Sequence, residues 1–479
     1  MSRYLTLPVL FFLAVLPGCA STLPYARIDR ALQDGNPAEG VAIIEKSHGA
    51  YGSKSETLYL MDKGMLEYVA SRYNESIQSL SKAEALTEDL YTQRLHTEVE
   101  AFLTSDNALP YAGEEFEKVL LNVLMALDYA QLGLWDDALV EARKVDHKLL
   151  VLADRNQKRM TYSKDALARY LSGILYEATG DFNNAFVAYR LAYDAFQQYR
   201  QAYGTPIPDL LRQDLLRVSE ALGLTQEHEE YKQNFPGITW QSEASSQGMG
   251  ELAFITFAGH APFKRDAFVD IPFSYDAMNV VLATNLYNRY ASQEYRTTQS
   301  ILYGLTGRVI RIAIPRFVRR PSAIAYTEAV IVAQGSRYTS HSVLMEDITA
   351  IAVKDLEERL ARTAAKAVAR AAWKYAMAEG VRIGARQAAG GQRDVGPLVG
   401  AVAGALAHIF AVATEEADKR SWATLPDRVH VGRLKIPPGT YDVELRHIGL
   451  SGGVVATQVI RSVTVAERGT RFVSARVLQ

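Results

Sequence analysis

The sequence contains almost no cysteine: Cys19 is the only one among 479 residues. A single cysteine cannot close a disulfide within the chain, build a cysteine-based zinc site or hold an iron–sulfur cluster. An excess of charge of one sign is also lacking, because 52 Lys and Arg residues stand against 54 Asp and Glu residues, for a net charge of -2. This balance excludes the broad basic field on which nucleic-acid binding depends.

Familiar catalytic and cofactor motifs are missing from the sequence as well. It has no Gly-x-Ser-x-Gly elbow, no P-loop and no Rossmann glycine fingerprint after a predicted strand. None of the 9 histidines has the spacing of a His-Glu-x-x-His zinc site. His260 and Lys264, in the distinctive loop 259–264, are a conceivable catalytic pair, but a structural turn is the simpler interpretation. We therefore expect no enzymatic activity, no cofactor and no metal.

The residues that are present suffice for several folded domains. Hydrophobic residues make up 48% of the chain and charged residues 22%, which is typical of globular and not of disordered proteins. At roughly 100–200 residues per domain, a chain of this length is expected to form two to four domains.

The N-terminal segment has the pattern of a bacterial lipoprotein signal peptide. Arg3 precedes an almost unbroken apolar run over 5–16, which is short for a membrane span but fits the hydrophobic region of a signal peptide. The run ends in Leu-Pro-Gly-Cys, which resembles a lipobox. The resemblance implies that 1–18 are removed and that Cys19 becomes the first mature residue and carries acyl chains. An ordinary secretory signal with an accidental cysteine is the alternative.

Lipidation would define where the protein works. Ala20 and Ser21 follow the cysteine in place of an aspartate, and this implies sorting to the outer membrane, with the mature chain at its periplasmic face. Two or more acyl chains anchor a protein stably, whereas one chain alone binds only marginally. We therefore expect contact with the membrane through the lipid on Cys19.

The segment 19–236 is expected to fold as helical repeats. Apolar residues recur at intervals of three and four, and helix breakers are sparse. In one helix–turn–helix signature, small residues would let two helices approach closely on either side of a glycine turn. Its residues are Gly173, Tyr176, Gly180, Ala185, Tyr189 and Ala192. Similar copies at 126–142 and 64–83 complete a pattern that resembles the tetratricopeptide repeat.

These predicted repeats are irregular. Tyr73, Trp135 and Phe182 hold equivalent positions but lie farther apart than the roughly 34 residues of a regular repeat. Stacked helical pairs share a core and leave a concave surface, which commonly binds a peptide or protein. Two interpretations remain open: this surface binds a partner, or the helices form only a packed scaffold.

A change of period predicts β structure in the second half. Residues 237–250 are rich in Ser, Gln and Gly and are expected to be a linker or an ordered loop. The regions 251–341 and 428–479 contain short alternating stretches typical of strands. The candidate strands are 251–257, 268–273, 309–314, 325–333, 429–436, 440–445, 454–465 and 472–477. We expect a β-sandwich-like region with a helical insertion.

The inserted segment 342–427 is expected to form a helical hairpin. An alanine-rich helical pattern runs from Ser342 to Met377, and 397–414 contains no charged residue. Small residues spaced by four form a ridge typical of close helix packing; they are Gly396, Gly400 and Gly404. The second helix could be buried in the hairpin, drive oligomerisation or enter the membrane, for which it is slightly short.

A local basic run surrounds two prolines between the second-half strands. Its members are Arg308, Arg311, Arg316, Arg319 and Arg320. Such a run can hold a phosphate, an acidic sugar or an acidic protein surface, and anionic lipid or cell-wall polymer would be candidates in the periplasm. It can equally be a solvated edge that keeps a strand from aggregating.

Several segments together resemble an uncharacterised family of tetratricopeptide-repeat-containing outer-membrane lipoproteins of Gram-negative bacteria. They are 107–149, 180–192, 251–264, 344–375 and 414–439, and they include the runs LGLWDDALVEAR, RSWATLP and RLKIPPGTY. The resemblance covers most of the mature chain. It implies an envelope lipoprotein with an assembly or interaction role, and it carries over no catalytic residue.

These patterns together predict an α+β multidomain protein, with helical repeats followed by a β region and its inserted hairpin. We expect an outer-membrane-anchored periplasmic scaffold that binds other envelope proteins and no nucleic acid. The alternative is a homo-oligomeric envelope ring or pore, assembled through the glycine-rich helix at 396–408.

Overall fold

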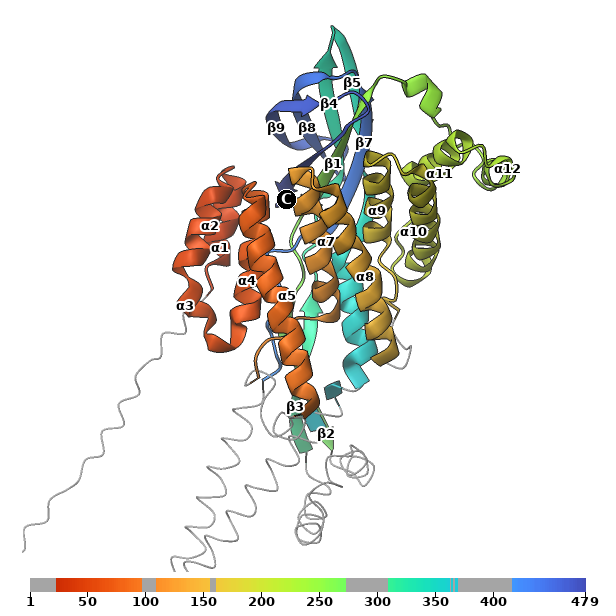
Figure 1. The fold of residues 1–479 in the computed structure, drawn as a ribbon. Helices are drawn as coiled ribbons and strands as arrows, with labels where there is room; N and C mark the ends of the chain where they lie inside the picture. The colour runs from red at the N-terminus through yellow and green to blue at the C-terminus, as the bar shows by residue number, and fades with distance from the viewer. Residues whose placement is uncertain are drawn as a thin grey trace, which may run out of the picture.

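Helices fill the first half of the chain and strands most of the second half (Figure 1). The computed structural model describes residues 23–96, 109–155, 161–272, 309–361, 363–364, 367–368 and 416–479. Within these ranges the protein is α+β, as the sequence predicts.

The helices form successive pairs, because the apolar stripe of each helix needs a neighbour to cover it. Short connections join α1 to α2, α4 to α5, α7 to α8, α9 to α10 and α11 to α12, and the members of each pair contact each other. The bounds are α1 Tyr25–Gln33, α2 Pro37–Lys46, α3 His48–Tyr51, α4 Glu56–Val69, α5 Tyr73–His96, α7 Glu115–Leu132, α8 Trp135–Arg155, α9 Ala166–Ala178, α10 Phe182–Ala202, α11 Asp209–Ala221 and α12 Thr225–Asn234.

A missing side chain sets the distance between α9 and α10. A Cβ atom on Gly173 would lie 2.2 Å from the ring of Tyr189, so the ring fits only against a glycine. Gly180 makes the turn between the helices with a φ of +79°, a conformation that favours glycine. Ala185 and Ala192 of α10 are fully buried.

The strands form two four-stranded sheets and a separate two-stranded ribbon. The first sheet has the order β10-β1-β7-β6, the second has the order β5-β4-β8-β9, and the ribbon is β2-β3. The bounds are β1 Gly250–Ala258, β2 Phe263–Pro272, β3 Val309–Val318, β4 Ile324–Ala333, β5 Ser336–His341, β6 Val343–Asp347, β7 Arg428–Ile436, β8 Gly439–Gly449, β9 Val454–Val465 and β10 Thr470–Val477. Because β1 lies between β10 and β7, the two β regions of the sequence share one sheet.

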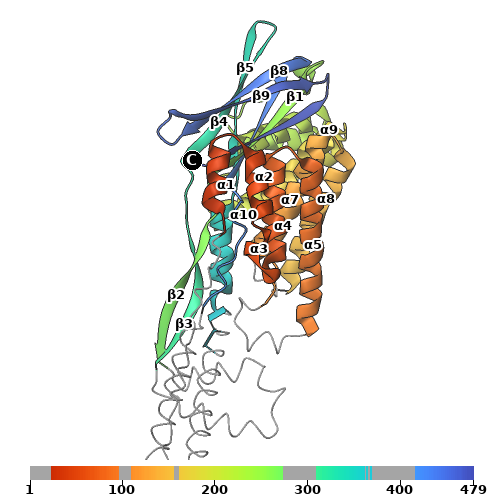
Figure 2. The same ribbon diagram turned by 90° about the vertical axis from the view of Figure 1, so that its left-hand side faces the viewer.

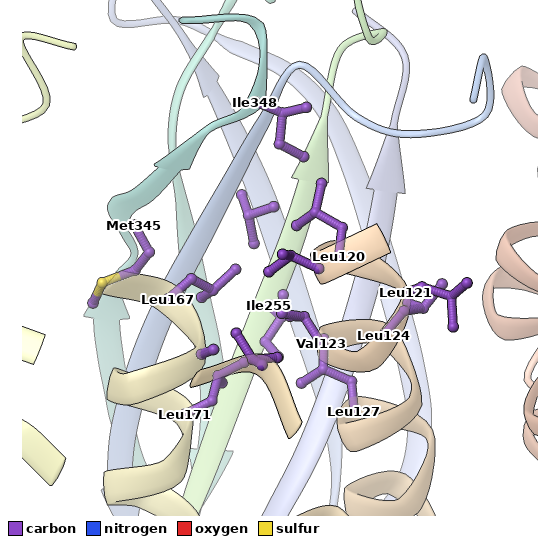
Figure 3. Close-up of a cluster of buried hydrophobic side chains, with 14 of the residues drawn as sticks. Leu120, Leu121, Val123, Leu124, Leu127, Leu167, Leu171, Ile255, Met345 and Ile348 are labelled. Atoms are coloured by element: carbon purple, nitrogen blue, oxygen red, sulfur yellow. The ribbon is translucent and has the colours of Figure 1, made fainter. Parts of the chain in front are cut away.

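Strand β1 lies at the centre of the layers, and all 9 of its residues are buried. Successive strand residues point to opposite faces of a sheet. Ala253, Ile255 and Phe257 belong to the core shared with the helices, whereas Leu252 and Phe254 belong to the core between the two sheets. Figure 3 shows Ile255 among leucine side chains of α7 and α9. Cover on both faces explains the nearly continuous apolar sequence of this strand.

The first helices of the pairs lie against this sheet. α4 and α7 contact β10, and α9 contacts β6. Aromatic pairs join the layers, with ring centroids 5.6 Å apart for Tyr68 and Phe257 and 6.1 Å apart for Trp135 and Phe472. Strands of the chain itself therefore cover the inner faces of these helices, where the sequence analysis had left open either partner binding or packing within the chain.

The segment 342–427 differs from the predicted helical hairpin at both ends. Val343–Asp347 form strand β6, which pairs with β7, and the helix begins only at Ile348. At the other end, 416–427 contains no helix. A five-residue strand is too short to reveal its own period, so its apolar residues merge with the helical pattern that follows.

The ribbon of β2 and β3 extends away from the two sheets, beside the row of helices (Figure 2). The base of the ribbon pairs Phe263 with Val318 and Lys264 with Phe317. The base of the ribbon forms part of the candidate site.

Candidate functional site

Two of the predicted sites lie outside the described residues: the lipidation residue Cys19, and the packing glycines Gly396, Gly400 and Gly404. Their roles stay predictions. Among the residues that the structure describes, no helix is both long and apolar enough to cross a bilayer. Within the same ranges, no group of three or more His, Cys, Asp or Glu side chains is arranged to hold a metal ion.

The repeat-signature residues lie between helices and at the turn of the α9–α10 pair. Gly173 and Tyr189 are in contact, as described above, and the Tyr189 hydroxyl accepts a hydrogen bond from Arg433 of β7 at 2.9 Å. Tyr176 is half-buried, and its hydroxyl accepts from Nη2 and Nε of Arg143 at 2.8 and 3.1 Å. The two tyrosines therefore tie α9 and α10 to their neighbours.

A pocket of about 600 Å³ lies where the N-terminal helices, the base of the ribbon and the segment 416–427 meet. Pockets of this size commonly hold small ligands. Part of its wall is apolar, and the residues of that part are Leu23, Tyr25, Leu58, Phe263 and Ala423. Because these residues come from segments far apart in the sequence, the pocket exists only in the folded chain.

Four cationic side chains line the same pocket: Lys264, Arg320, Lys419 and Arg420. Three of them have carboxylate partners. Lys264 contacts Glu114. The Nζ atom of Lys419 lies 2.9 Å from Asp266, and Nη2 of Arg420 lies 2.7 Å from Asp418.

Arg320 is held in a different way. Its Nε and Nη2 atoms donate to the carbonyl oxygen of Ala261 at 2.9 and 2.5 Å, and its guanidinium lies 5.5 Å from the ring centroid of Phe263. In the described part of the chain, no carboxylate lies within ion-pair distance of it. Burial lowers the pKa of Arg320, and the charges of Asp29 and Asp427 offset this only in part.

His260 and Asp29 lie side by side in the pocket wall, with Nδ1 and Oδ1 3.8 Å apart. Burial, together with the charges of Arg476 and Arg320, lowers the pKa of His260 to about 4. The imidazole is therefore neutral at pH 7. Burial also raises the pKa of Asp29.

A buried carboxylate, Asp62 of α4, holds the apolar end of the pocket together. It accepts hydrogen bonds from the hydroxyls of Tyr25 and Tyr51 at 2.7 and 2.9 Å. It also accepts from the amide and hydroxyl of Thr424 at 3.1 and 2.8 Å. Burial raises the pKa of Asp62 to about 6, against the lowering effect of these hydrogen bonds.

The N-terminal end of α7 provides a second buried acidic centre. Glu114 contacts both Lys264 and Arg359, and these cations outweigh burial and lower its pKa. Glu117 accepts from the Trp422 amide at 2.7 Å. These contacts fix the positions of the ribbon base and of 416–427 relative to the helices.

A third cluster, centred on Arg433 of β7, lies away from the pocket. Its guanidinium approaches Glu177 at 2.5 Å, Glu251 at 2.7 Å and Asp214 at 2.8 Å. Arg217 of α11 contacts Glu177 at 2.5 Å. Burial would raise the pKa of Glu177, but the two arginines lower it to about 2. We call these five residues the Arg433 cluster; they join α9 and α11 to the first sheet.

The sequence analysis singled out two parts of the pocket, the loop 259–264 and the basic run that includes Arg320. It did not find Asp62, Glu114 or Arg433, because an isolated charge in an amphipathic segment ordinarily indicates a solvated surface. For Asp62 a signal does exist, since its helix is apolar on every side, and nearly all of that helix is buried.

Neither a family model nor a curated protein matches the chain. Solved structures align with less than half of it. MamA aligns at 16% identity over 43% of this chain and 90% of that chain, with a TM-score of 0.27. A Podosopora anserina putative kinesin light chain with TPR-like repeats aligns at 15% identity over 45% of this chain and 92% of that chain, with a TM-score of 0.31. A Rap protein complexed with competence and sporulation factor aligns at 15% identity over 44% of this chain and 51% of that chain, with a TM-score of 0.28.

Proposed function

We propose that the chain is an envelope lipoprotein, anchored through Cys19 at the periplasmic face of the outer membrane, that acts as a scaffold for a protein partner and not as an enzyme. The lipobox pattern supports the anchor. The fused helical and sheet layers support the scaffold role, since buried clusters such as the Arg433 cluster hold the two layers in a fixed relation.

One observation carries the scaffold role: the second helices of two neighbouring pairs expose large aliphatic side chains on their outer faces. Leu150 of α8 is 69% exposed and Val187 of α10 is 50% exposed, and Val140 and Leu191 on the same helices are also exposed. Water-facing positions of a helix are ordinarily polar. Because the inner helix faces already cover the sheet, we assign partner binding to the outer faces of α8 and α10.

The charges beside these residues define the chemistry of the partner. The exposed charges near the aliphatic side chains are of both signs: Arg143 and Asp137 on α8, and Arg190 and Asp194 on α10. Interfaces typically combine an apolar centre with a polar rim, and arginine is enriched in them. We therefore expect a protein partner with an apolar contact surface and a rim that carries charges of both signs.

Site-specific crosslinking in cells tests this assignment. A photoreactive residue in place of Leu150 or Val187 should capture the same protein, whereas the same residue in place of Val332, which is 67% exposed on β4, should not. The purified captured protein should bind the chain, and Val140→Glu should weaken that binding at least tenfold. Equal capture from all three positions, or binding unaffected by Val140→Glu, would remove the assignment.

Fractionation tests the anchor separately. Cys19→Ala should move the protein from the membrane fraction to the soluble periplasm, because the lipid on Cys19 is its proposed attachment. A variant that stays with the membrane would show that another part of the chain anchors it.

A further inference from the structure

The pocket beside the N-terminal helices combines apolar walls with a cationic side chain. Leu23, Leu58 and Phe263 give it apolar walls, and Arg320 places a guanidinium in the same cavity. An apolar wall facing water is unfavourable, and so is a partly buried cation that lacks a carboxylate partner. One kind of ligand would satisfy both at once: a molecule with an acyl chain and an anionic head.

The surroundings of Arg320 show that the charge is not balanced within the fold. A second guanidinium, that of Arg476, is buried nearby and donates to the carbonyl oxygens of Phe257 and Gly259 at 3.0 and 2.6 Å. Burial lowers the pKa of both arginines. His260 is neutral at pH 7, as described above. Among the described residues that line the pocket, Asp29 is the only acidic one.

The position of the pocket in the chain indicates where such a ligand would come from. Leu23, which lines the pocket, follows Cys19 by four residues. Whatever their conformation, four residues span at most about 14 Å. An acyl group on the Cys19 sulfur would therefore hold the pocket within reach of the lipid head groups.

We propose that this pocket binds an anionic phospholipid of the membrane to which the chain is anchored. An acyl chain lies between Leu58, Phe263 and Ala423, and the phosphate accepts hydrogen bonds from Arg320. The arginine fork matches phosphate geometry and forms charge-assisted hydrogen bonds. The source of the lipid rests on the proposed function; the chemistry of the pocket does not.

Direct binding measurements test the pocket chemistry. The full mature chain carrying Cys19→Ala, which has no covalent acyl chain of its own, is titrated with dihexanoyl phosphatidylglycerol by calorimetry. We expect one bound lipid per chain and an affinity about tenfold above that of dihexanoyl phosphatidylcholine, because phosphatidylcholine carries the same phosphate but adds a choline cation, which is repelled by the guanidinium of Arg320. Equal affinity for the two lipids would overturn the proposal.

Matched variants locate the binding. Arg320→Gln should lose the preference for phosphatidylglycerol and Arg320→Lys should restore part of it, whereas Arg316→Gln, in the same basic run but outside the pocket, should change nothing. Ala423→Trp should fill the apolar space and abolish binding of both lipids. Near-ultraviolet circular dichroism of each variant checks that the fold is intact. A folded Arg320→Gln protein with unchanged affinity for phosphatidylglycerol would refute the site.

Two further ligands distinguish the source of the anion. Inorganic phosphate should bind far more weakly than phosphatidylglycerol, and equal affinity would overturn the amphiphile. Laurate that binds more tightly than phosphatidylglycerol would instead identify a free fatty acid as the ligand and overturn the phospholipid.

Failure of the anchor and failure of the pocket give different results. If Cys19→Ala stays in the membrane fraction but the purified chain binds phosphatidylglycerol, the anchor proposal fails and the pocket proposal stands. If Cys19→Ala becomes soluble but the purified chain does not distinguish the two lipids, the pocket proposal fails and the anchor proposal stands.

Discussion

Two buried polar junctions connect the helices to the strands, and they differ in whether their arginines have carboxylate partners. In the Arg433 cluster, two arginines lie within 3 Å of three carboxylates. None of these five residues lines the pocket. At the pocket, Arg320 and Arg476 donate mainly to backbone carbonyls. Both junctions hold layers together, but only the second leaves positive charge and open space. We assign a structural role to the cluster whose arginines are paired with carboxylates, and the proposed binding role to the open one, whose Arg320 is not so paired in the described part of the chain.

Removing the central arginine of the Arg433 cluster should have the largest effect on stability. Arg433→Met leaves Glu177, Glu251 and Asp214 buried with less compensation, and breaking a buried pair in this way costs about 3–5 kcal/mol. Urea unfolding should show this loss in the free energy of unfolding. Arg446→Met, on the exposed face of β8, is the control and should cost far less, because exposed ion pairs contribute little to stability. Similar losses for both would show that the cluster is not a special junction.

The helix contact next to the Arg433 cluster should give a smaller effect. A Cβ on Gly173 would collide with the ring of Tyr189, whose hydroxyl accepts from Arg433, and overpacking typically costs about 1–3 kcal/mol. Gly173→Ala should therefore lower the melting temperature. Gly49→Ala, where an added Cβ meets nothing within 4 Å, should leave it unchanged. An unaffected Gly173→Ala protein would mean that the two helices separate easily.

The pocket junction should respond to pH through Asp62. Its pKa is about 6 in the folded chain and about 3.9 when unfolded, so folding favours the protonated carboxyl. The resulting stabilisation is complete below the unfolded pKa and is lost as the pH rises through about 6. Between pH 4 and pH 7, wild type should lose on the order of 2 kcal/mol relative to Asp62→Asn. Parallel pH profiles for the two proteins would contradict this environment for Asp62.

Removing Arg320, the arginine without a carboxylate partner among the described residues, should have the smallest effect on stability. Arg320→Gln removes only this unpaired charge, so the free energy of unfolding should change by less than about 1 kcal/mol. A loss as large as that of Arg433→Met would show that Arg320 serves structure and would erase the difference between the two junctions.

The sequence predicts well whatever depends on neighbours along the chain. The α9–α10 pair follows from small residues and a glycine turn, and β1 follows from a short apolar run. The strand Val343–Asp347 was hidden because five residues carry too little periodicity beside a strong helical pattern.

Contacts between distant segments could not be predicted from one sequence. Nothing near Arg433 indicates that it meets Glu177, and nothing near Trp135 indicates that it lies against Phe472. Such pairs depend on which face of the helical layer the sheet covers. For the pocket, the sequence supplied the loop 259–264 and the basic run, but not the fact that they meet.

Strand β10 has a consequence for the order in which the protein can mature. Arg471 reaches the carbonyl oxygen of Gln131, 340 positions earlier in the chain, and Phe472 lies against Trp135. A chain that crosses a membrane with its N-terminus first delivers α4 and α7 long before β10. Until β10 is delivered, the apolar inner surfaces of these helices stay exposed to solvent and can associate with other proteins. If the chain is exported as proposed, a holding chaperone would have to cover these helices, and a chain truncated before β10 would expose them to proteases.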